Sequence, residues 1–314
     1  MPPRRSLDPK LDVVFKLLFS EPRNRGLLRE LLSAVLRPSS PICSIEILNP
    51  TPGKQHPTDR GSVMDLLLKL DDGRRVHVEM QARKRPSFVS RGLFYWARAY
   101  AGQLTSGQPY ESLAPTTGIF ILDYLELSTP RYHSVYKVLS THDGSALNDD
   151  LELHFLELPK FPKDSAERPP LDNVVKWGQF LSAQTDEQLE LLAVTDPILR
   201  QAKEALDRLS DDPIAREEAI KREYELGDYE FHFKRGMAEA RELGLSQGIE
   251  QGIEQGIEQG RKEGEATLRN AIGQACSAFA IPLDERRSKI LESASLAELG
   301  GLLAAILTQQ RWPS

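Results

Sequence analysis

The chain has 314 residues, and its 40 Lys and Arg against 46 Asp and Glu give a net charge of −6. This length allows two or three domains, the first with ample residues for a core of its own. No run approaches the roughly 18 uninterrupted apolar residues that a membrane helix needs. No apolar signal-peptide segment follows Arg4 and Arg5 either. We therefore expect a cytoplasmic protein without a membrane-spanning segment.

The charge is distributed unevenly along the chain. Residues 1–110 hold 18 Lys and Arg against 10 Asp and Glu, whereas residues 111–314 hold 22 against 36. A positive surface in the first part would attract a phosphate backbone. The candidate DNA contacts are Arg83, Lys84, Arg85 and Arg91. The alternative is that they are solvated helix residues.

Strand-like and helix-like runs succeed one another in the first half. Apolar residues at helical spacing predict a first helix over residues 11–36, with Asp8 as its cap and Pro38 beyond its end. The other predicted elements are a strand at 42–48, two strands within 62–81, a helix at 87–105 and strands at 117–122, 132–139 and 151–158. This order indicates an α/β fold.

The most informative segment is a candidate β-hairpin that carries an acid on each arm. Asp and Gly at positions 71–73 favour a tight turn, because both tolerate positive φ. With a three-residue loop, Leu70 pairs with Arg74, and counting back along the ladder places Asp65 opposite Glu79. Facing like charges destabilise a sheet unless a cation lies between them. The pattern predicts a divalent-metal site; a two-residue loop, which would shift the register, and an ordinary amphipathic hairpin are the alternatives.

Alternation assigns the side chains of this hairpin to two faces. The face that we expect to be buried comprises Met64, Leu66, Leu68, Val76, Val78 and Met80. Asp65, Glu79 and Gln81 lie on the other face. We interpret His77, beside Glu79 on that face, as a solvated side chain.

These residues in this order resemble the PD-(D/E)XK nuclease superfamily, and within it the recombination-promoting nuclease or putative-transposase group. The resemblance covers roughly residues 7–161. It rests on residues 11–19, Asp65 with 79–81, residues 91–95 with Gly107 and Tyr110, and residues 156–161. It implies a restriction-endonuclease-like αβββαβ core with a mixed sheet, followed here by an α-helical C-terminal region.

The resemblance also implies roles for single residues. Asp65 and Glu79 correspond to the superfamily's metal-binding acids, and Asp12 to the acid at the start of its first helix. The Met80 carbonyl would join the two acids in holding Mg²⁺. Gln81 stands where the superfamily usually has Lys; an amide cannot accept a proton as an amine can, so Gln81 could orient a water that the metal activates.

The second half is predicted to be helical after a Pro- and Lys-rich linker. A long amphipathic stretch from residue 214 contains Gln-Gly-Ile-Glu three times between residues 247 and 258. Each Gly costs about 1 kcal/mol relative to Ala in a helix. Either a second helix covers the Gly and Ile stripe or the repeat is a weakly helical tether. Residues 265–311 are predicted to form three short helical segments, the last capped by Ser295 with Glu298 in a capping box.

Together these patterns predict four parts. They are a nuclease-like domain at 1–161, a helical region at 162–235, a repeat helix or tether at 236–264 and a helical module at 265–314. The combined interpretation is a Mg²⁺-dependent DNA endonuclease that forms a homo-oligomer through its C-terminal region. Family resemblance links it to recombination or mobile elements. The alternatives are a catalytically weak or inactive DNA-binding or interaction protein, which Gln81 favours, and a scaffold that self-associates through residues 214–311.

Overall fold

The computed structural model describes residues 6–48, 65–162 and 172–313. The chain divides into two compact units, Met1–Asp228 and Tyr229–Ser314. Within the described residues, no helix combines the length and the apolar character needed to cross a bilayer.

A six-stranded sheet forms the centre of the first unit, with strand order β1-β2-β3-β4-β6-β5. Its strands are β1 (Ile45–Ile47), β2 (Leu66–Leu70), β3 (Arg75–Gln81), β4 (Thr116–Leu122), β5 (His133–Lys137) and β6 (Leu151–Glu157). Strands β3, β4 and β6 run parallel, and the other three pairings are antiparallel. The mixed sheet and its flanking helices confirm the predicted α/β fold.

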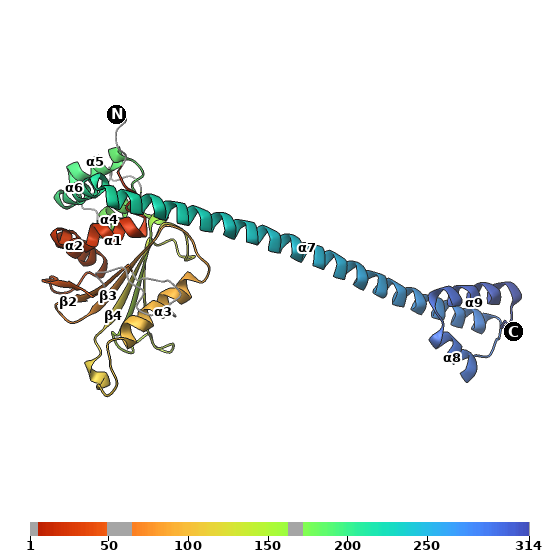
Figure 1. Ribbon diagram of the computed structural model, residues 1–314. Helices are drawn as coiled ribbons and strands as arrows, with labels where there is room; N and C mark the ends of the chain where they lie inside the picture. Colours follow the sequence, from red (N-terminus) through yellow and green to blue (C-terminus); the bar gives the residue numbers. More distant parts are fainter. Residues whose placement is uncertain (1–5, 49–64, 163–171, 314) are drawn as a thin grey trace, which may run out of the picture. The chain divides into compact units, whose positions relative to one another are not determined.

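Helices cover both faces of this sheet (Figure 1). The first face packs, in one hydrophobic core, against α1 (Asp12–Ser20), α2 (Arg25–Leu36), α4 (Asn173–Ser182), α5 (Asp186–Thr195) and α6 (Pro197–Asp211). Helix α3 (Phe88–Ala101) connects β3 to β4 and covers the second face. There Phe88 stands edge-on to Phe120, with 5.6 Å between ring centroids. Short 3-10 turns lie at Pro22–Asn24, Tyr110–Ser112 and Leu158–Lys160.

The hairpin has the predicted three-residue loop. The Leu70 amide donates to the Arg74 carbonyl at 2.9 Å, and Gly73 supplies a φ of 87°. Leu67 pairs with His77, so the register is the predicted one. The described members of the apolar face, Leu66, Leu68, Val76, Val78 and Met80, are completely buried. Met64 lies outside the described residues.

The expectation of a solvated His77 was wrong. His77 is completely buried and stands edge-on to Tyr95 and Phe120, at 5.7 and 5.8 Å between ring centroids. The reason is α3, which covers the face of the hairpin that alternation alone assigned to solvent.

The predicted first helix is interrupted, and its predicted cap was wrong. Helix α1 ends at Ser20 and α2 begins at Arg25. Pro22 holds the preceding Glu21 in an extended conformation, with φ −64° and ψ 129°, because the residue before proline is sterically restricted. The Asp8 carboxylate accepts a hydrogen bond from the Lys10 amide at 2.9 Å. It does not cap α1.

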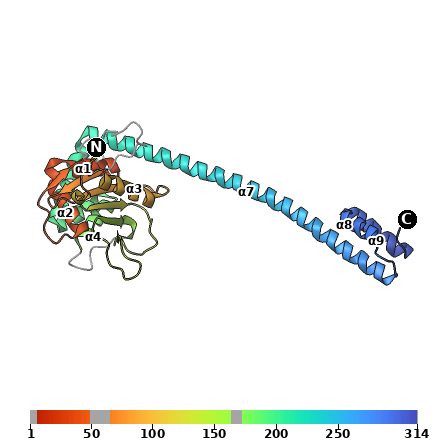
Figure 2. The ribbon, with the colours of Figure 1, turned by 90° about the horizontal axis from the view of Figure 1, so that it is seen from below.

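Helix α7 (Pro213–Ala278) is one uninterrupted helix that contains the Gln-Gly-Ile-Glu repeat (Figure 2). The side chains of Ile249, Ile253 and Ile257 are 55, 59 and 69% exposed. A Cβ atom added to the repeat glycines would have no neighbour within 4 Å. The repeat therefore makes no packing contact that requires glycine within the described chain.

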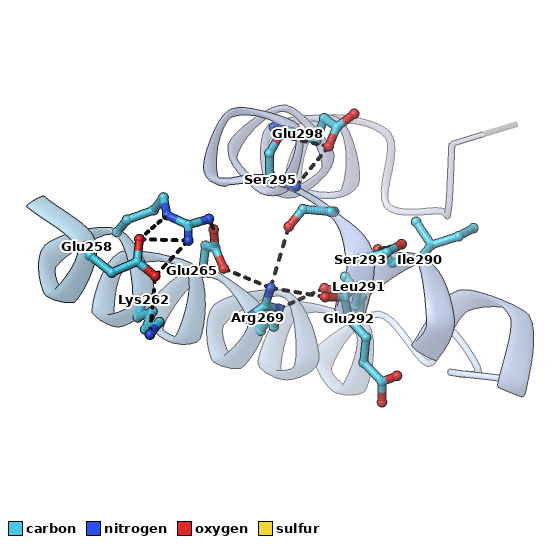
Figure 3. Close-up of polar contacts among 12 residues, drawn as sticks. Glu258, Lys262, Glu265, Arg269, Ile290, Leu291, Glu292, Ser293, Ser295 and Glu298 are labelled. Atoms are coloured by element: carbon cyan, nitrogen blue, oxygen red, sulfur yellow. Dashed lines mark hydrogen bonds and ion pairs between the residues drawn. The ribbon is translucent and has the colours of Figure 1, made fainter.

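In the second unit, the end of α7 packs with α8 (Glu285–Ser293) and α9 (Leu296–Gln309) around a small core of its own. Ser295 and Glu298 form the predicted capping box at the start of α9. Arg269 of α7 donates to the Leu291 carbonyl at 2.7 Å and so satisfies a backbone acceptor at the end of α8 (Figure 3).

Candidate metal centre

Two buried carboxyl groups lie where β2 begins beside β3. Asp65 directly precedes β2 and is 9% exposed, and Glu79 within β3 is 4% exposed. The Met80 amide donates to Asp65 Oδ2 at 2.7 Å. Since the N–H and C=O of a strand residue face the same neighbour, the Met80 carbonyl lies on the Asp65 side of β3. Two carboxyl groups and a backbone carbonyl thus converge at one end of the hairpin.

The electrostatics of this pair disfavour negative charge. Burial, and then the charges of Glu79 and Asp12, raise the pKa of Asp65 well above its ordinary value of 3.8. Burial also raises the pKa of Glu79 to about 7, although the Arg91 and Arg85 charges oppose that rise. Neighbouring acids of this kind are stabilised in their ionised form by a cation.

The Glu79 carboxylate is satisfied on one side only. Its Oε1 accepts hydrogen bonds from Gln81 Nε2 at 2.8 Å and from Arg91 Nη2 at 3.3 Å. Its Oε2 is buried and has no hydrogen-bond partner within the described parts of the chain. His77 Nε2 lies 3.7 Å from Oε2, but burial lowers the pKa of His77 to about 3, so this imidazole is neutral near pH 7. Because buried oxygens are nearly always partnered, Oε2 is a candidate ligand atom for a cation.

This donor set fits Mg²⁺. Carboxylate and carbonyl oxygens are the hard ligands that this ion prefers, and Mg²⁺ usually takes only one or two carboxylates from the protein. Across residues 6–48, 65–162 and 172–313, no three His, Cys, Asp or Glu side chains come together closely enough to hold an ion. Water and substrate phosphate would therefore supply the remaining ligands.

Gln81 and Arg91 form a hydrogen-bonded chain with Glu79. Gln81 Oε1 accepts from Arg91 Nη2 at 2.8 Å, while its amide nitrogen donates to Glu79. The Arg91 guanidinium also lies over the ring of Phe88, 5.1 Å from its centroid. Arg91, one of the candidate DNA contacts, therefore lies beside Glu79. The hydrogen bonds from Gln81 and Arg91 fix the orientation of the Glu79 carboxylate.

Asp12 lies at the edge of the acid pair, and its charge acts on both Asp65 and Glu79. Arg222 of α7 holds its carboxylate by two hydrogen bonds, Nε to Oδ1 at 2.8 Å and Nε to Oδ2 at 2.9 Å. A further short contact joins Arg222 Nη2 to Oδ2. The acid expected at the start of the first helix is thus neutralised by an arginine 210 residues away in sequence.

The remaining candidate DNA contacts lie on the segment that follows β3. Lys84 donates to the Leu125 carbonyl at 3.0 Å and lies 3.1 Å from Glu126, with a side chain that is 59% exposed. The charge of Arg85 acts on Glu79, and that of Arg83 acts on Asp123. Of these three cations, Arg85 is therefore the one whose charge acts on Glu79 of the acid pair.

Sequence reasoning did not single out Lys16 or Arg222. Lys16 follows Asp12 by four residues on α1, so both lie on one helix face, and this spacing was a usable signal. No sequence signal pointed to Arg222, because no local pattern links it to Asp12.

Comparison with known protein families assigns the chain to one of them. The family model of the PD-(D/E)XK nuclease family transposases matches residues 9–234. The chain therefore belongs to this family, which confirms the resemblance found in the sequence. Searches of curated proteins and of solved structures each gave no match. Family membership implies a role in nuclease or transposition chemistry.

Proposed function

We propose that the first unit is a metal-dependent DNA endonuclease that hydrolyses phosphodiester bonds. The observation that carries this proposal is the pair of buried acids, Asp65 and Glu79, with the Glu79 Oε2 atom left without a partner among the described residues. A buried carboxylate pair costs free energy unless a cation offsets it. Family membership supports the choice of nuclease chemistry.

In this proposal Asp65, Glu79 and the Met80 carbonyl hold Mg²⁺. The ion, when bound, supplies a water of lowered pKa and neutralises phosphate charge. Arg91 and Gln81 hold the Glu79 carboxylate in one orientation through their hydrogen bonds. Gln81 has no basic nitrogen, so its part is to orient Glu79 and a nearby water. Asp12 binds a second ion or a water only when Arg222 releases it.

The proposed substrate is DNA, because the first 110 residues carry an excess of positive charge that includes Arg83, Lys84 and Arg85. A second candidate function is DNA binding without cleavage. It is favoured by Gln81 in the place of Lys and by the engagement of Asp12 with Arg222. Recombination or mobile-element processes are the proposed biological setting, with the cytoplasm as the proposed location.

Cleavage of supercoiled plasmid with and without Mg²⁺ tests the proposal. We expect nicking by the wild-type chain only with the metal, and loss of nicking in Asp65→Ala and Glu79→Ala. Asp149→Ala is the matched control, because its side chain is 79% exposed. If either acid variant stays folded and fully active, the acid pair is not the metal site. Salt-sensitive DNA binding without cleavage under any divalent metal would establish the second candidate function.

We also propose that the chain forms a homo-oligomer through the repeat of α7. The exposed isoleucines Ile249, Ile253 and Ile257 offer apolar area along one helix. The neighbouring glycines allow a second helix of the same sequence to approach closely. Burial of each isoleucine would contribute roughly 1.5–3 kcal/mol, enough to offset the glycine cost.

A further inference from the structure

Lys16 carries a buried ammonium group whose hydrogen-bonding capacity is unused. Its Nζ atom is buried and has no hydrogen-bond partner within the described residues. The charge of Asp65 acts on it and opposes the lowering of the Lys16 pKa that burial causes. The ammonium therefore lies within electrostatic reach of Asp65, and its three N–H donors have no acceptor among the described residues.

Two other cations at this site already have partners. Arg91 donates to both Glu79 and Gln81. Arg222 binds Asp12 and, at 3.1 Å, Glu225. Buried donors are nearly always satisfied in folded proteins. A buried ammonium near Asp65 that has no acceptor among the described residues indicates that its acceptor arrives with a ligand.

We propose that Lys16 is a catalytic residue that donates a hydrogen bond to a non-bridging oxygen of the scissile phosphate. This inference rests on the proposed function, because the phosphate must first be held at the acid pair. The ammonium reaches the site from α1, whereas Gln81 on β3 carries no charge. Lys16 thus supplies the positive charge that an amide at position 81 lacks.

The proposed role is electrostatic. In phosphoryl transfer, negative charge spreads over the non-bridging oxygens, and fixed cations stabilise it. Lys16 exchanges no proton in this step. A purely structural alternative is that Lys16 only neutralises Asp65 in the metal-free protein. Once the metal site is saturated, the catalytic role predicts slower cleavage in a variant without the charge, whereas the structural role predicts an unchanged rate.

The test compares Lys16→Met, Lys16→Arg and the control Lys69→Met in the full chain. Methionine keeps an unbranched side chain one atom shorter than that of lysine and removes the charge. Lys69 is exposed at the other end of β2 from Asp65. Three quantities are measured: Mn²⁺ affinity without DNA by calorimetry, plasmid nicking at saturating Mg²⁺, and the melting temperature.

For Lys16→Met we expect nicking to fall about 10²–10³-fold, the usual effect of removing one charge-stabilising donor. Mn²⁺ affinity should be unchanged or tighter, because a cation beside Asp65 is gone. Lys16→Arg should retain more activity than Lys16→Met, and Lys69→Met should match the wild type in all three quantities.

Tighter Mn²⁺ binding with wild-type nicking in Lys16→Met would show that Lys16 is only a counter-ion, and would overturn the inference while leaving the proposed function intact. Equal loss of nicking in Lys16→Met and Lys16→Arg, with weaker metal binding or a lower melting temperature, would also overturn it. A wild-type chain that binds Mn²⁺ but cleaves no DNA would overturn the proposed function and this inference together.

Discussion

Burial of Asp65 has an energetic cost in the metal-free protein. It is 9% exposed, and its pKa is raised because burial and the charge of Glu79 both disfavour ionisation. The folded state therefore holds its proton at pH values where the unfolded chain has released it. Above the ordinary pKa of 3.8, this group makes the free energy of unfolding fall as pH rises.

Asp65→Asn should consequently stabilise the metal-free protein. Asparagine can still accept the Met80 hydrogen bond but carries no charge. We expect a gain of about 1–3 kcal/mol in the free energy of unfolding at pH 8 and a smaller gain at pH 5. Chemical denaturation at both pH values measures it, with the exposed Asp149→Asn as control. A loss of stability at pH 8 would show that the buried carboxyl is not a source of strain.

At the residue scale, the acids could be located from sequence and their surroundings could not. Alternation along a hairpin with a recognisable turn placed Asp65, Glu79 and Gln81 on one face. Burial of His77 depends on α3, and the Asp12–Arg222 pair joins residues 210 positions apart. Such contacts depend on tertiary packing, which a local pattern does not encode.

At the element scale, most strands and helices were predictable because their apolar periodicity is strong. Predicted ends differed by a few residues, as for α3, which ends at Ala101 before Gly102. The break at Pro22 was visible in the sequence, yet the apolar spacing continues on both sides of it, and periodicity alone therefore joined α1 to α2. The steric restriction on the residue before Pro22 predicts the end of α1 there.

The repeat of α7 offers a sharp test of self-association. In the single chain, a methyl group added at Gly248, Gly252 and Gly256 meets nothing within 4 Å. If the helix stands alone, alanine at all three positions should therefore stabilise the helix by about 1 kcal/mol per site. If a second copy packs closely over the glycines, the same substitutions should weaken assembly. Analytical ultracentrifugation distinguishes these results.

The matched control is Gly236→Ala, because Gly236 lies on α7 outside the repeat and has equally open surroundings. We expect the wild-type chain to form dimers or larger assemblies. The triple alanine variant should assemble more weakly, and the control variant should assemble like the wild type. A wild-type monomer at micromolar concentration, with an unchanged or more helical triple variant, would support the tether interpretation.

At the scale of the whole molecule, the sheet and the helices that follow it share one core. Trp177, Phe180 and Leu206 are buried in the cluster that includes α1, α2 and the hairpin. Gly178 lets α4 approach closely, because a Cβ there would lie 2.2 Å from the ring of Phe161. These contacts make the first unit depend on residues beyond 161.

Truncation tests this dependence and the domain boundary that the sequence predicts at residue 161. A chain ending at residue 234, where the family match ends, should fold cooperatively and bind DNA with affinity that falls steeply with salt. A chain ending at residue 161 lacks the buried helices and Arg222, so it should aggregate or show no thermal transition. Cooperative unfolding of the shorter chain would place the boundary at residue 161.

In the proposed function, Asp65 and Glu79 together hold one divalent ion. Calorimetric titration of the full chain with Mn²⁺ at pH 8 tests it most directly, alongside Asp65→Asn, Glu79→Gln and the control Asp149→Asn. We predict one ion bound per chain, with affinity at least about tenfold weaker in each acid variant, a loss of about 1.4 kcal/mol or more, and unchanged in the control. Wild-type affinity in both folded acid variants would show that these two acids do not hold the ion.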